Sequence, residues 1–385
     1  MSAVESPEPF GFALPTRIRF GAGTRHETGA QAAALGDRAI LVTGGSFAHN
    51  TAGTDVTSSL ATAGVIVVDH VVGRGEPTDD AVRDLALRIG DVDATVVVAV
   101  GGGSVLDLAK AAALRPSPER LEALLEGERT QDGGLPVIAL PTTAGSGAEV
   151  SHAAIVLHRA SGRKRGVRGP GVAAAVAIVD PELMAGAPAT VIASAGFDAI
   201  AHAIETSASR AASDLVVHLA AMALPRLLEA VPGAMREPDR REHLTSAAYA
   251  ALLMGINLAN STTCLPHRLQ YPVGARTATS HARGVAALFP AWLERIVAVA
   301  PSSLARLATA AAIASVDDTP ETAARRLQAQ VIAHLESTGM RTSLTDLGVG
   351  AGDLPGLVAA VEGSVANDPG PSAASDLLDL YAASL

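Results

Sequence analysis

The sequence has little of what marks secreted, nucleic-acid-binding or aromatic-rich proteins. A single cysteine, Cys264, means that no disulfide can form within the chain, which favours a reducing compartment. The formal net charge of −10 argues against a nucleic-acid partner, because no basic stripe is present to neutralise phosphates. Aromatic residues make up only 3% of the chain, so we expect aliphatic side chains and alanine to fill its core.

Signals for export or membrane insertion are missing as well. The segment Met1–Thr16 has no basic stretch followed by an apolar run, as a signal peptide requires. No stretch of about 18 residues is apolar without polar interruptions, as a membrane helix requires. These absences predict a soluble, cytoplasmic protein that has no membrane partner.

Aliphatic residues are what the chain has in abundance, and hydrophobic residues make up 48% of it. Its 385 residues exceed what one core usually serves, which favours two domains. Continuous apolar runs predict buried parallel strands at 39–42, 65–68, 94–100 and 137–140. Helix-like stretches at 79–89 and 104–114 lie between them and complete a βαβ pattern.

The pattern changes after about Asp180, where Ala- and Leu-rich helical stretches replace the strands. We therefore predict an α/β domain over residues 1–184, with a parallel sheet that helices cover on both faces. Residues 185–385 are predicted to form an all-helical domain. The basic, glycine-rich segment 159–171 is predicted to be a hairpin or loop, and a Pro/Ser-rich segment at 367–375 to precede a final short helix.

A glycine-rich turn at 101–104 follows the strongest predicted strand and begins a helix. Backbone amides at a helix N-terminus bind phosphate, and glycines allow a phosphate to approach closely. The turn matches neither GxGxxG nor GxxxxGK[ST], so a standard dinucleotide or P-loop motif is not indicated. A second segment, 141–151, offers hydroxyls and glycines after the next strand. Together the two turns predict one nucleotide crevice at the carboxyl edge of the sheet.

Four residues could hold a metal ion. Asp198 and His202 are four residues apart in a predicted helix and share one face, although such a pair more often lies at a surface. His267 and His281 follow later, with Pro272, Gly274 and a predicted turn between them, and could equally be core histidines. One Asp and three His form a plausible ligand set for Fe²⁺ or Zn²⁺ with open positions for a substrate oxygen.

Taken in order, these segments resemble the iron-containing (group III) alcohol dehydrogenases, of the dehydroquinate-synthase-like superfamily. The resemblance runs from about Thr16 to the C-terminus and rests on GGGSVLDLAK (101–110), PTTAGSGAEVS (141–151), IVDPEL (178–183), GFDAIAHAIE (196–205) and the two later histidines. It implies the dehydroquinate-synthase-like fold and an NAD(P)-dependent alcohol dehydrogenase or aldehyde reductase. It also implies a homodimer or higher homo-oligomer.

The resemblance assigns roles to individual positions. It implies metal ligation by Asp198, His202, His267 and His281. It implies that Gly102, Gly103 and Ser104 hold the cofactor's pyrophosphate, and that Thr142, Thr143 and Ser146 line the nicotinamide and ribose. Lys164 falls where the family has a cofactor-contacting lysine, although it could also be a solvated loop charge. Gly44, Asp107 and Leu183 complete the predicted cofactor-binding set.

Two departures from the family concern the cofactor and the site's surroundings. Many NAD-preferring members carry Asp where this chain has Gly44, followed by Gly45 and Ser46. No carboxylate at this position repels the 2′-phosphate of NADPH, so the enzyme should accept NADPH as well as NADH. We hypothesise that it prefers NADPH.

The second departure lies near the metal ligands, where many members have a histidine and this chain has Tyr271. The stretch STTCLPHRLQYPV (261–273) instead resembles the branch that contains phosphonoacetaldehyde reductases. The sequence Ser-His-Ala-Arg (280–283) also replaces the frequent Pro-His-Gly.

Three arginines, Arg268, Arg276 and Arg283, lie close in sequence to the last two histidines. They predict an anionic substrate, such as a phosphonate or carboxylate aldehyde, unless they face solvent or pair with acidic residues. The predicted reaction is reversible hydride transfer, with His267 and Tyr271 as catalytic candidates. Tyr271, a cofactor ribose hydroxyl or a metal-associated water could relay the proton. The alternative is lyase or cyclase chemistry without net redox. A non-catalytic binding protein is disfavoured, because all four ligands and both glycine-rich turns are present.

Overall fold

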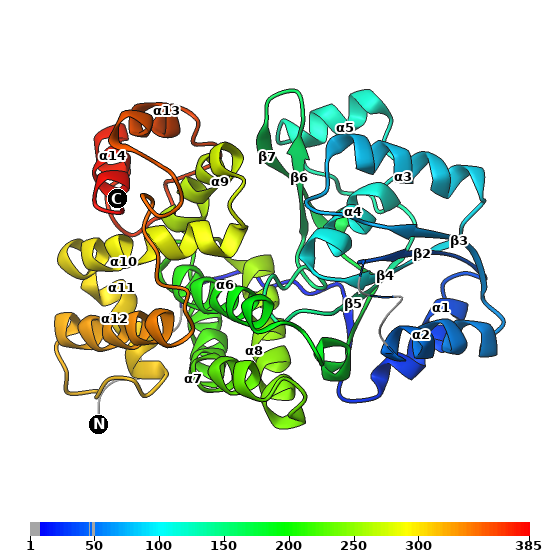
Figure 1. Cartoon of the computed structure of the whole chain (residues 1–385), viewed down its shortest axis with the longest axis horizontal. Helices are drawn as coiled ribbons and strands as arrows, with labels where there is room; N and C mark the ends of the chain where they lie inside the picture. The colour runs from blue at the N-terminus through cyan, green and yellow to red at the C-terminus, as the bar shows by residue number, and fades with distance from the viewer. Residues whose placement is uncertain (1–7, 46, 48–50) are drawn as a thin grey trace. The chain divides into compact units, whose positions relative to one another are not determined.

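The computed structural model describes residues 8–45, 47 and 51–385, which fall into two compact units (Figure 1). The first, here called the sheet unit, comprises Leu14–Gly196 and Gly233–Ala259. The second, the helical unit, comprises, of the described residues, 8–13, Phe197–Pro232 and Asn260–Leu385. An α/β unit and a helical unit confirm the predicted fold class, whereas the boundary at residue 184 stays a prediction.

The sheet unit is built on six parallel strands in the order β1-β8-β5-β4-β2-β3. Their bounds are β1 (Arg17–Phe20), β2 (Arg38–Thr43), β3 (Ile66–Val72), β4 (Val96–Gly101), β5 (Val137–Pro141) and β8 (Val176–Val179). The four strands predicted from apolar runs are present, and β2, β4 and β5 are buried as expected, whereas β3 is largely exposed. Strands β1 and β8 were missed. β1 alternates arginines with apolar residues, and β8 lies in an alanine-rich run that resembles a buried helix as much as a strand.

Helices cover both faces of this sheet, as predicted. They are α1 (Thr28–Ala33), α2 (Thr51–Thr62), α3 (Asp79–Asp91), α4 (Gly103–Ala113) and α5 (Pro118–Leu125). Successive residues of β4 point to opposite faces, so Val97 packs in the core with α3, α4 and α5, while Val96 packs in the core with α1 and α2. Helix α3 begins where the Thr78 hydroxyl accepts the amide of Ala81, a typical N-cap.

A hairpin and a sequence-distant helix complete the sheet unit. Strands β6 (Ala153–His158) and β7 (Arg163–Arg168) pair antiparallel, so the predicted basic hairpin exists, with its first strand upstream of residue 159. Helix α8 (Arg241–Asn260) returns to the sheet unit. There Gly255 contacts Gly147 so closely that a Cβ on Gly147 would lie 2.2 Å from the Gly255 Cα. Gly147 also has φ +63°, so glycine is required at this turn on both grounds.

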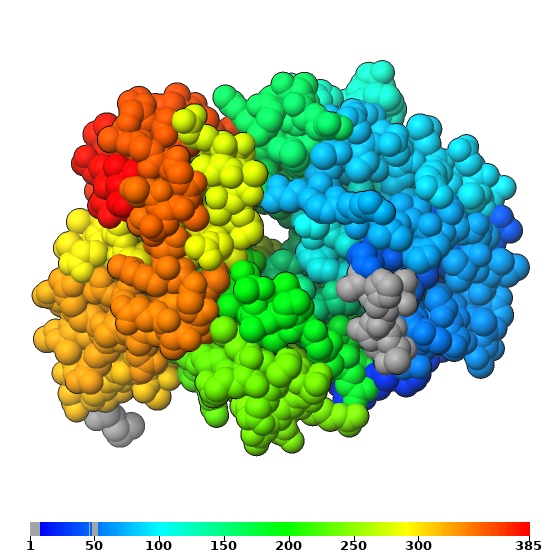
Figure 2. Space-filling model, in the orientation of Figure 1, coloured from blue at the N-terminus to red at the C-terminus, as the bar shows by residue number. Residues whose placement is uncertain are grey.

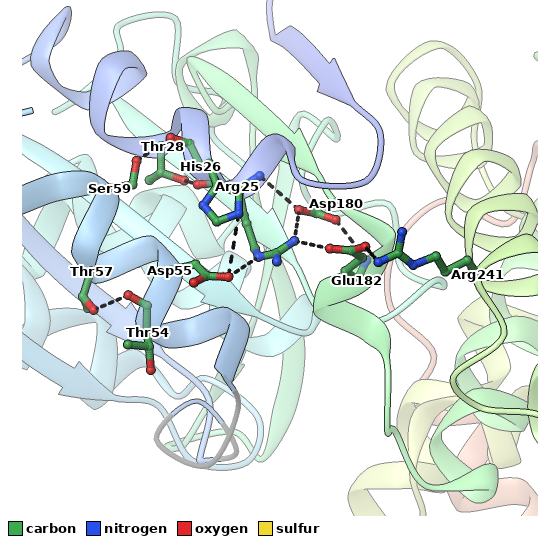
Figure 3. A network of polar contacts seen from close by, with 10 residues as sticks. All are labelled: Arg25, His26, Thr28, Thr54, Asp55, Thr57, Ser59, Asp180, Glu182 and Arg241. Carbon is green, nitrogen blue, oxygen red and sulfur yellow. Dashed lines mark hydrogen bonds and ion pairs between the residues drawn. The ribbon is translucent and has the colours of Figure 1, made fainter. Parts of the chain in front are cut away.

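A polar network joins the end of β8 to the first helical turn of the sheet unit (Figure 3). The Arg25 guanidinium donates to Asp180 (2.9 Å), Glu182 (2.5 Å) and Asp55 (2.8 Å). Arg241, at the start of α8, pairs with the other oxygen of Glu182 at 2.6 Å. Asp180 is completely buried, so its charge is compensated by Arg25 rather than by solvent.

The helical unit contains the helices that carry the predicted metal ligands. Its main elements are α6 (Ala189–Ala208), which begins in the sheet unit, α7 (Asp214–Arg236), α9 (Leu265–Thr277), α10 (His281–Val299), α11 (Pro301–Ala310), α12 (Pro320–Ser337), α13 (Leu354–Ala359) and α14 (Ala374–Ala382). Helix α12, orange in Figure 2, buries Leu327 and Val331 and exposes Glu321 and Arg325. This apolar stripe at helical spacing fixes which face packs inward.

The predicted turn between His267 and His281 is present. Pro272 and Gly274 also lie between the two histidines, inside α9. Helix α9 ends at Thr277, and its C-cap residue Ala278 adopts φ +54°. A proline inside a helix removes only one backbone donor, and the surrounding packing can outweigh that cost.

Within the described residues, one helix is long and apolar enough to cross a membrane by length and composition. This is α7, of whose most apolar window 44% is buried in the structure. The bent pair α10–α11 passes the same test only if it is counted as one broken span. Helix α7 is interrupted by His218, Arg226 and Glu229, so it is not a run free of polar residues. A single helix of this kind is weak evidence for a membrane span, because core helices of soluble proteins pass the same test.

Candidate metal centre

The four predicted metal ligands come together in the helical unit. Asp198 and His202 lie on α6, His267 lies on α9, and His281 is the first residue of α10. The Oδ1 atom of Asp198 is 3.8 Å from Nε2 of His202, 3.5 Å from Nε2 of His267 and 3.5 Å from Nε2 of His281. The His202 and His267 rings stack with centroids 4.7 Å apart. Three imidazole nitrogens thus converge on one carboxylate oxygen.

Burial and unused hydrogen-bonding capacity show that this convergence fits a cation. One donor atom each from Asp198, His267 and His281 lies within 4.8 Å of the others. Asp198 Oδ1 and His267 Nε2 are buried and have no hydrogen-bond partner among the described residues. Buried polar atoms without partners are costly, and a metal ion would satisfy both. An Asp-His₃ donor set suits iron(II) or zinc.

Two further residues, which the sequence reasoning missed, orient the imidazoles. Nδ1 of His267 lies 2.5 Å from Oε1 of the fully buried Glu205, and Nδ1 of His281 lies 2.7 Å from Oε1 of Gln270. These oxygens accept, so each Nδ1 donates and each Nε2 keeps its lone pair for a metal. Glu205 is seven residues after Asp198, hence on the same face of α6, which is the signal that could have found it.

Space for Gln270 is provided by glycines. A Cβ on Gly274 would lie 2.6 Å from Nε2 of Gln270, and a Cβ on Gly284 would lie 2.5 Å from its Cγ. Gln270 is completely buried between these two positions of α9 and α10. Gly274 therefore makes room for the residue that orients His281.

The charges of the cluster favour a bound cation. Burial alone would raise the pKa of Asp198, but the imidazoles of His202, His281 and His267 hold it below its ordinary value. Burial likewise disfavours a charged His267, yet Glu205 and Asp198 raise the pKa of this imidazole to about 10. Two buried carboxylates thus attract positive charge, and a divalent cation would balance both.

The predicted cofactor residues of the two glycine-rich turns lie side by side in the sheet unit. Strands β4 and β5 are neighbours in register, with Gly101 opposite Pro141, and the amide of Thr142 donates to the carbonyl of Gly101 at 3.0 Å. A Cβ on Gly103 would lie 2.6 Å from Oγ of Ser146, and one on Gly102 would lie 3.4 Å from Oγ1 of Thr143. This close approach explains why glycine stands at position 103, whereas a Cβ at position 102 would be in ordinary contact.

Gly44 belongs to the same edge. It follows β2, and its amide donates to the carbonyl of Val100 at the end of β4. Strand β2 lies between β3 and β4, so the chain reverses its direction across the sheet at this point. Nucleotides bind outside the carboxyl ends of parallel strands at such a switch point, and the N-terminus of α4, at Gly103 and Ser104, faces the same edge. Ser46 lies outside the described residues.

Three other predicted cofactor residues have protein partners in the sheet unit. The Asp107 carboxylate is buried, accepts the amide of Ile155 at 3.0 Å and lies 3.5 Å from the Lys110 ammonium. Lys164, on β7, forms an ion pair with Glu76. Leu183 packs in the core beneath α1 and α2. Their assignment to the cofactor stays a prediction.

The three arginines of the predicted anion site differ in environment. Arg276 is exposed and pairs with Asp353 at 2.5 Å. Arg283 is exposed, and its guanidinium donates to the Thr342 hydroxyl at 3.5 Å. Arg268 is buried. Tyr271, one helical turn after His267, stacks on the ring of His281 with centroids 6.0 Å apart.

Comparison with known proteins supports the same class. The sequence family described as iron-containing alcohol dehydrogenase matches residues 15–181, and the C-terminal family of Fe-containing alcohol dehydrogenases matches residues 192–385. Choline dehydrogenase of Bacillus subtilis (strain 168) is 31% identical over 329 residues, which cover 84% of this chain and 82% of the relative. Maleylacetate reductase 2 of Cupriavidus pinatubonensis is 31% identical over 296 residues, 77% of this chain and 76% of the relative.

Solved structures share the fold. Sulfoacetaldehyde reductase of Bifidobacterium kashiwanohense, in complex with NAD⁺, gives a TM-score of 0.87 at 25% identity and covers 97% of this chain and 98% of its own. Alcohol dehydrogenase from Oenococcus oeni gives a TM-score of 0.91 at 22% identity, over 98% of this chain and 100% of its own.

These findings place the chain among the NAD(P)-dependent enzymes that interconvert alcohols with aldehydes. The chain belongs to the iron-containing alcohol dehydrogenase family, and membership implies a metal and a nicotinamide cofactor.

Proposed function

We propose that this enzyme interconverts a small anionic aldehyde and its alcohol with NADPH or NADH, at a divalent metal held by Asp198, His202, His267 and His281. The observation that carries the proposal is the convergence of three imidazole nitrogens on the buried Oδ1 of Asp198. Iron and zinc both suit these ligands. Relatives named for the reduction of sulfoacetaldehyde and maleylacetate support an acidic substrate. Phosphonoacetaldehyde, suggested by the 261–273 stretch, is the first aldehyde to test.

The chain's own residues prepare the site for hydride transfer. A bound divalent cation supplies Lewis-acid polarisation of a carbonyl oxygen. Glu205 and Gln270 hold His267 and His281 with Nε2 directed at the cluster. In the sheet unit, the glycines at the start of α4 leave backbone amides available for the cofactor's pyrophosphate. Binding of the nicotinamide in a fixed place, rather than covalent chemistry by the protein, is the proposed task of the sheet unit.

Proton transfer is proposed to involve Tyr271. Its ring stacks on His281, so its hydroxyl belongs to the surroundings of the cluster. If Tyr271 gives the proton to the nascent alkoxide, Tyr271→Phe should lower kcat roughly 100-fold, since general acid catalysis contributes at least this much. The measurement is kcat across the pH range in which the enzyme is stable. A kcat unchanged by the substitution at every pH would limit Tyr271 to packing.

Cofactor preference is expected to follow from Gly44. Without a carboxylate at this position, kcat/KM should be higher for NADPH than for NADH. Gly44→Asp should lower the NADPH:NADH ratio of kcat/KM at least about tenfold, because the new carboxylate binds ribose hydroxyls and repels a 2′-phosphate. A Cβ at Gly44 has ordinary van der Waals contact with Val105, at 3.8 Å, so the side chain fits. Gly44→Ala separates bulk from charge, and a strong NADH preference of the parent would refute the hypothesis.

An aldehyde panel tests the proposed function directly. Enzyme reconstituted with Fe²⁺ or Zn²⁺ is offered phosphonoacetaldehyde, a carboxylate aldehyde and a neutral aldehyde of equal length, and NADPH oxidation is followed. We expect stoichiometric NADPH consumption and a higher kcat/KM for the anionic aldehydes. Preference for the neutral aldehyde would refute the anionic substrate. Turnover of a substrate without net NADPH or NADH consumption would instead favour the lyase or cyclase alternative.

A further inference from the structure

Arg268 is a buried cation that no carboxylate of the described residues pairs with. Its side chain lies in the helical unit, directly after the proposed ligand His267, and the residue is 9% exposed. Its guanidinium donates to two neutral oxygens at long distances: the Thr262 hydroxyl at 3.2 Å and the Ser364 carbonyl at 3.4 Å. No carboxylate of the described chain lies within 4.0 Å of it. Most of its five donors therefore lack a strong acceptor.

Other arginines of similar burial, in contrast, lie close to carboxylates. Arg25 faces three carboxylates, and Arg295 lies near Asp368 and Asp376. Taking a guanidinium out of water is costly unless an opposite charge and good hydrogen bonds compensate it. At Arg268 no described residue provides this compensation, which is the condition expected of a site whose anion is a ligand.

We propose that Arg268, together with the Thr262 hydroxyl, binds the anionic group of the substrate and so selects aldehydes that carry an oxyanion. This inference rests on the proposed function, because it takes the neighbouring cluster as the place where the carbonyl reacts. Arg268 directly follows His267 in α9, so their α-carbons are about 3.8 Å apart, although the side chains of consecutive helical residues point in different directions. Phosphonate, sulfonate and carboxylate groups all offer the oxygen pairs that a planar guanidinium binds in bidentate fashion.

The structure therefore distinguishes the three arginines that were predicted to bind an anionic substrate. Arg276 already has the carboxylate of Asp353 and is exposed to solvent, where an ion pair contributes little. Arg283 is exposed as well. The proposal gives the specificity-determining role to Arg268, the one of these three that is buried and faces only neutral partners in the described structure.

The test compares Arg268→Met, which removes the charge and keeps an apolar stem, with Arg268→Lys and with the parent enzyme. kcat/KM is measured for phosphonoacetaldehyde, a carboxylate aldehyde and a neutral aldehyde of equal length. Arg268→Met should lower the anionic-to-neutral ratio of kcat/KM about 10- to 100-fold, mainly through KM, and Arg268→Lys should recover part of the loss. Arg306→Met, which removes an exposed arginine paired with Asp214, is the matched control. Equal losses for charged and neutral aldehydes would show a purely structural role.

A binding measurement separates failure of this inference from failure of the proposed function. Methylphosphonate, which cannot be reduced, is titrated calorimetrically into the metal-loaded parent and variant. We expect binding to the parent and at least tenfold weaker binding to Arg268→Met. If the parent reduces neutral aldehydes yet does not bind methylphosphonate, the anion site is wrong and the reaction type stands. If methylphosphonate binds through Arg268 but no aldehyde is reduced, the proposed reaction is wrong and the anion site stands.

Discussion

The Asp198→Ala variant is expected to lose its bound metal and roughly a thousandfold in kcat/KM for aldehyde reduction. The reason is geometric, because Oδ1 of Asp198 is the atom on which three imidazole nitrogens converge within 3.8 Å. Loss of metal would remove several kcal/mol of carbonyl polarisation, which corresponds to about this factor in rate. Metal content after dialysis and the thermal shift caused by added Fe²⁺ or Zn²⁺ are measured beside activity. The cation should raise the melting temperature of the parent but not of the variant.

A graded response distinguishes a metal site from a merely buried charge cluster. Glu205→Gln keeps the shape of the side chain that holds Nδ1 of His267 but removes its charge, and should weaken metal binding about 10- to 100-fold. His218→Ala, which removes an exposed histidine of α7, should bind metal like the parent. If Asp198→Ala and Glu205→Gln retained metal with parental affinity in competition with a chelator, the ligand assignment would be wrong.

The sequence predicts most clearly those strands whose side chains are buried on both faces of the sheet. Strands β2, β4 and β5 are buried on both faces, so each appears as a continuous apolar run. Strand β1 lies at an edge with alternating exposure, and its pairing with β8 depends on residues some 160 positions away, as the register of Arg17 with Val176 shows. Likewise, no local sequence pattern predicts that α8 packs Gly255 against Gly147.

For the candidate site, residue spacing predicted the two ligands on α6 but not the residues that orient the histidine ligands through hydrogen bonds. Asp198 and His202 share a helix face, so their proximity follows from sequence alone. The contact of Glu205 with His267 joins α6 to α9, and its existence depends on how these helices pack. Charge compensation also depends on packing, because the sequence alone does not distinguish the environments of Arg268, Arg276 and Arg283. Only the structure shows that Arg276 meets a carboxylate while buried Arg268 meets two neutral oxygens.

The second large effect is expected at Arg25, far in sequence from its main partner. Arg25→Met should lower the free energy of unfolding of the sheet unit by about 3–5 kcal/mol, because it leaves the fully buried Asp180 carboxylate without its charge partner (Figure 3). Burial opposes a charged Arg25, but Glu182, Asp180 and Asp55 together hold its pKa above the ordinary value. The guanidinium therefore stays charged at every pH of interest. The midpoint of thermal unfolding should fall by about 10 °C.

Because the chain has two units, two spectroscopic signals can show in which unit the stability is lost. Trp292, the only tryptophan, lies in the helical unit, so its fluorescence reports unfolding there, while far-UV circular dichroism reports both units. Arg25→Met should therefore move the dichroism transition below that of Trp292. Arg19→Met breaks the exposed pair of Arg19 with Glu27 and should cost at most about 1 kcal/mol. Adding Asp180→Asn to Arg25→Met removes the stranded charge and should restore part of the stability. Without such recovery the loss could not be assigned to the buried carboxylate, because coupling between contacting residues appears as non-additivity of this kind.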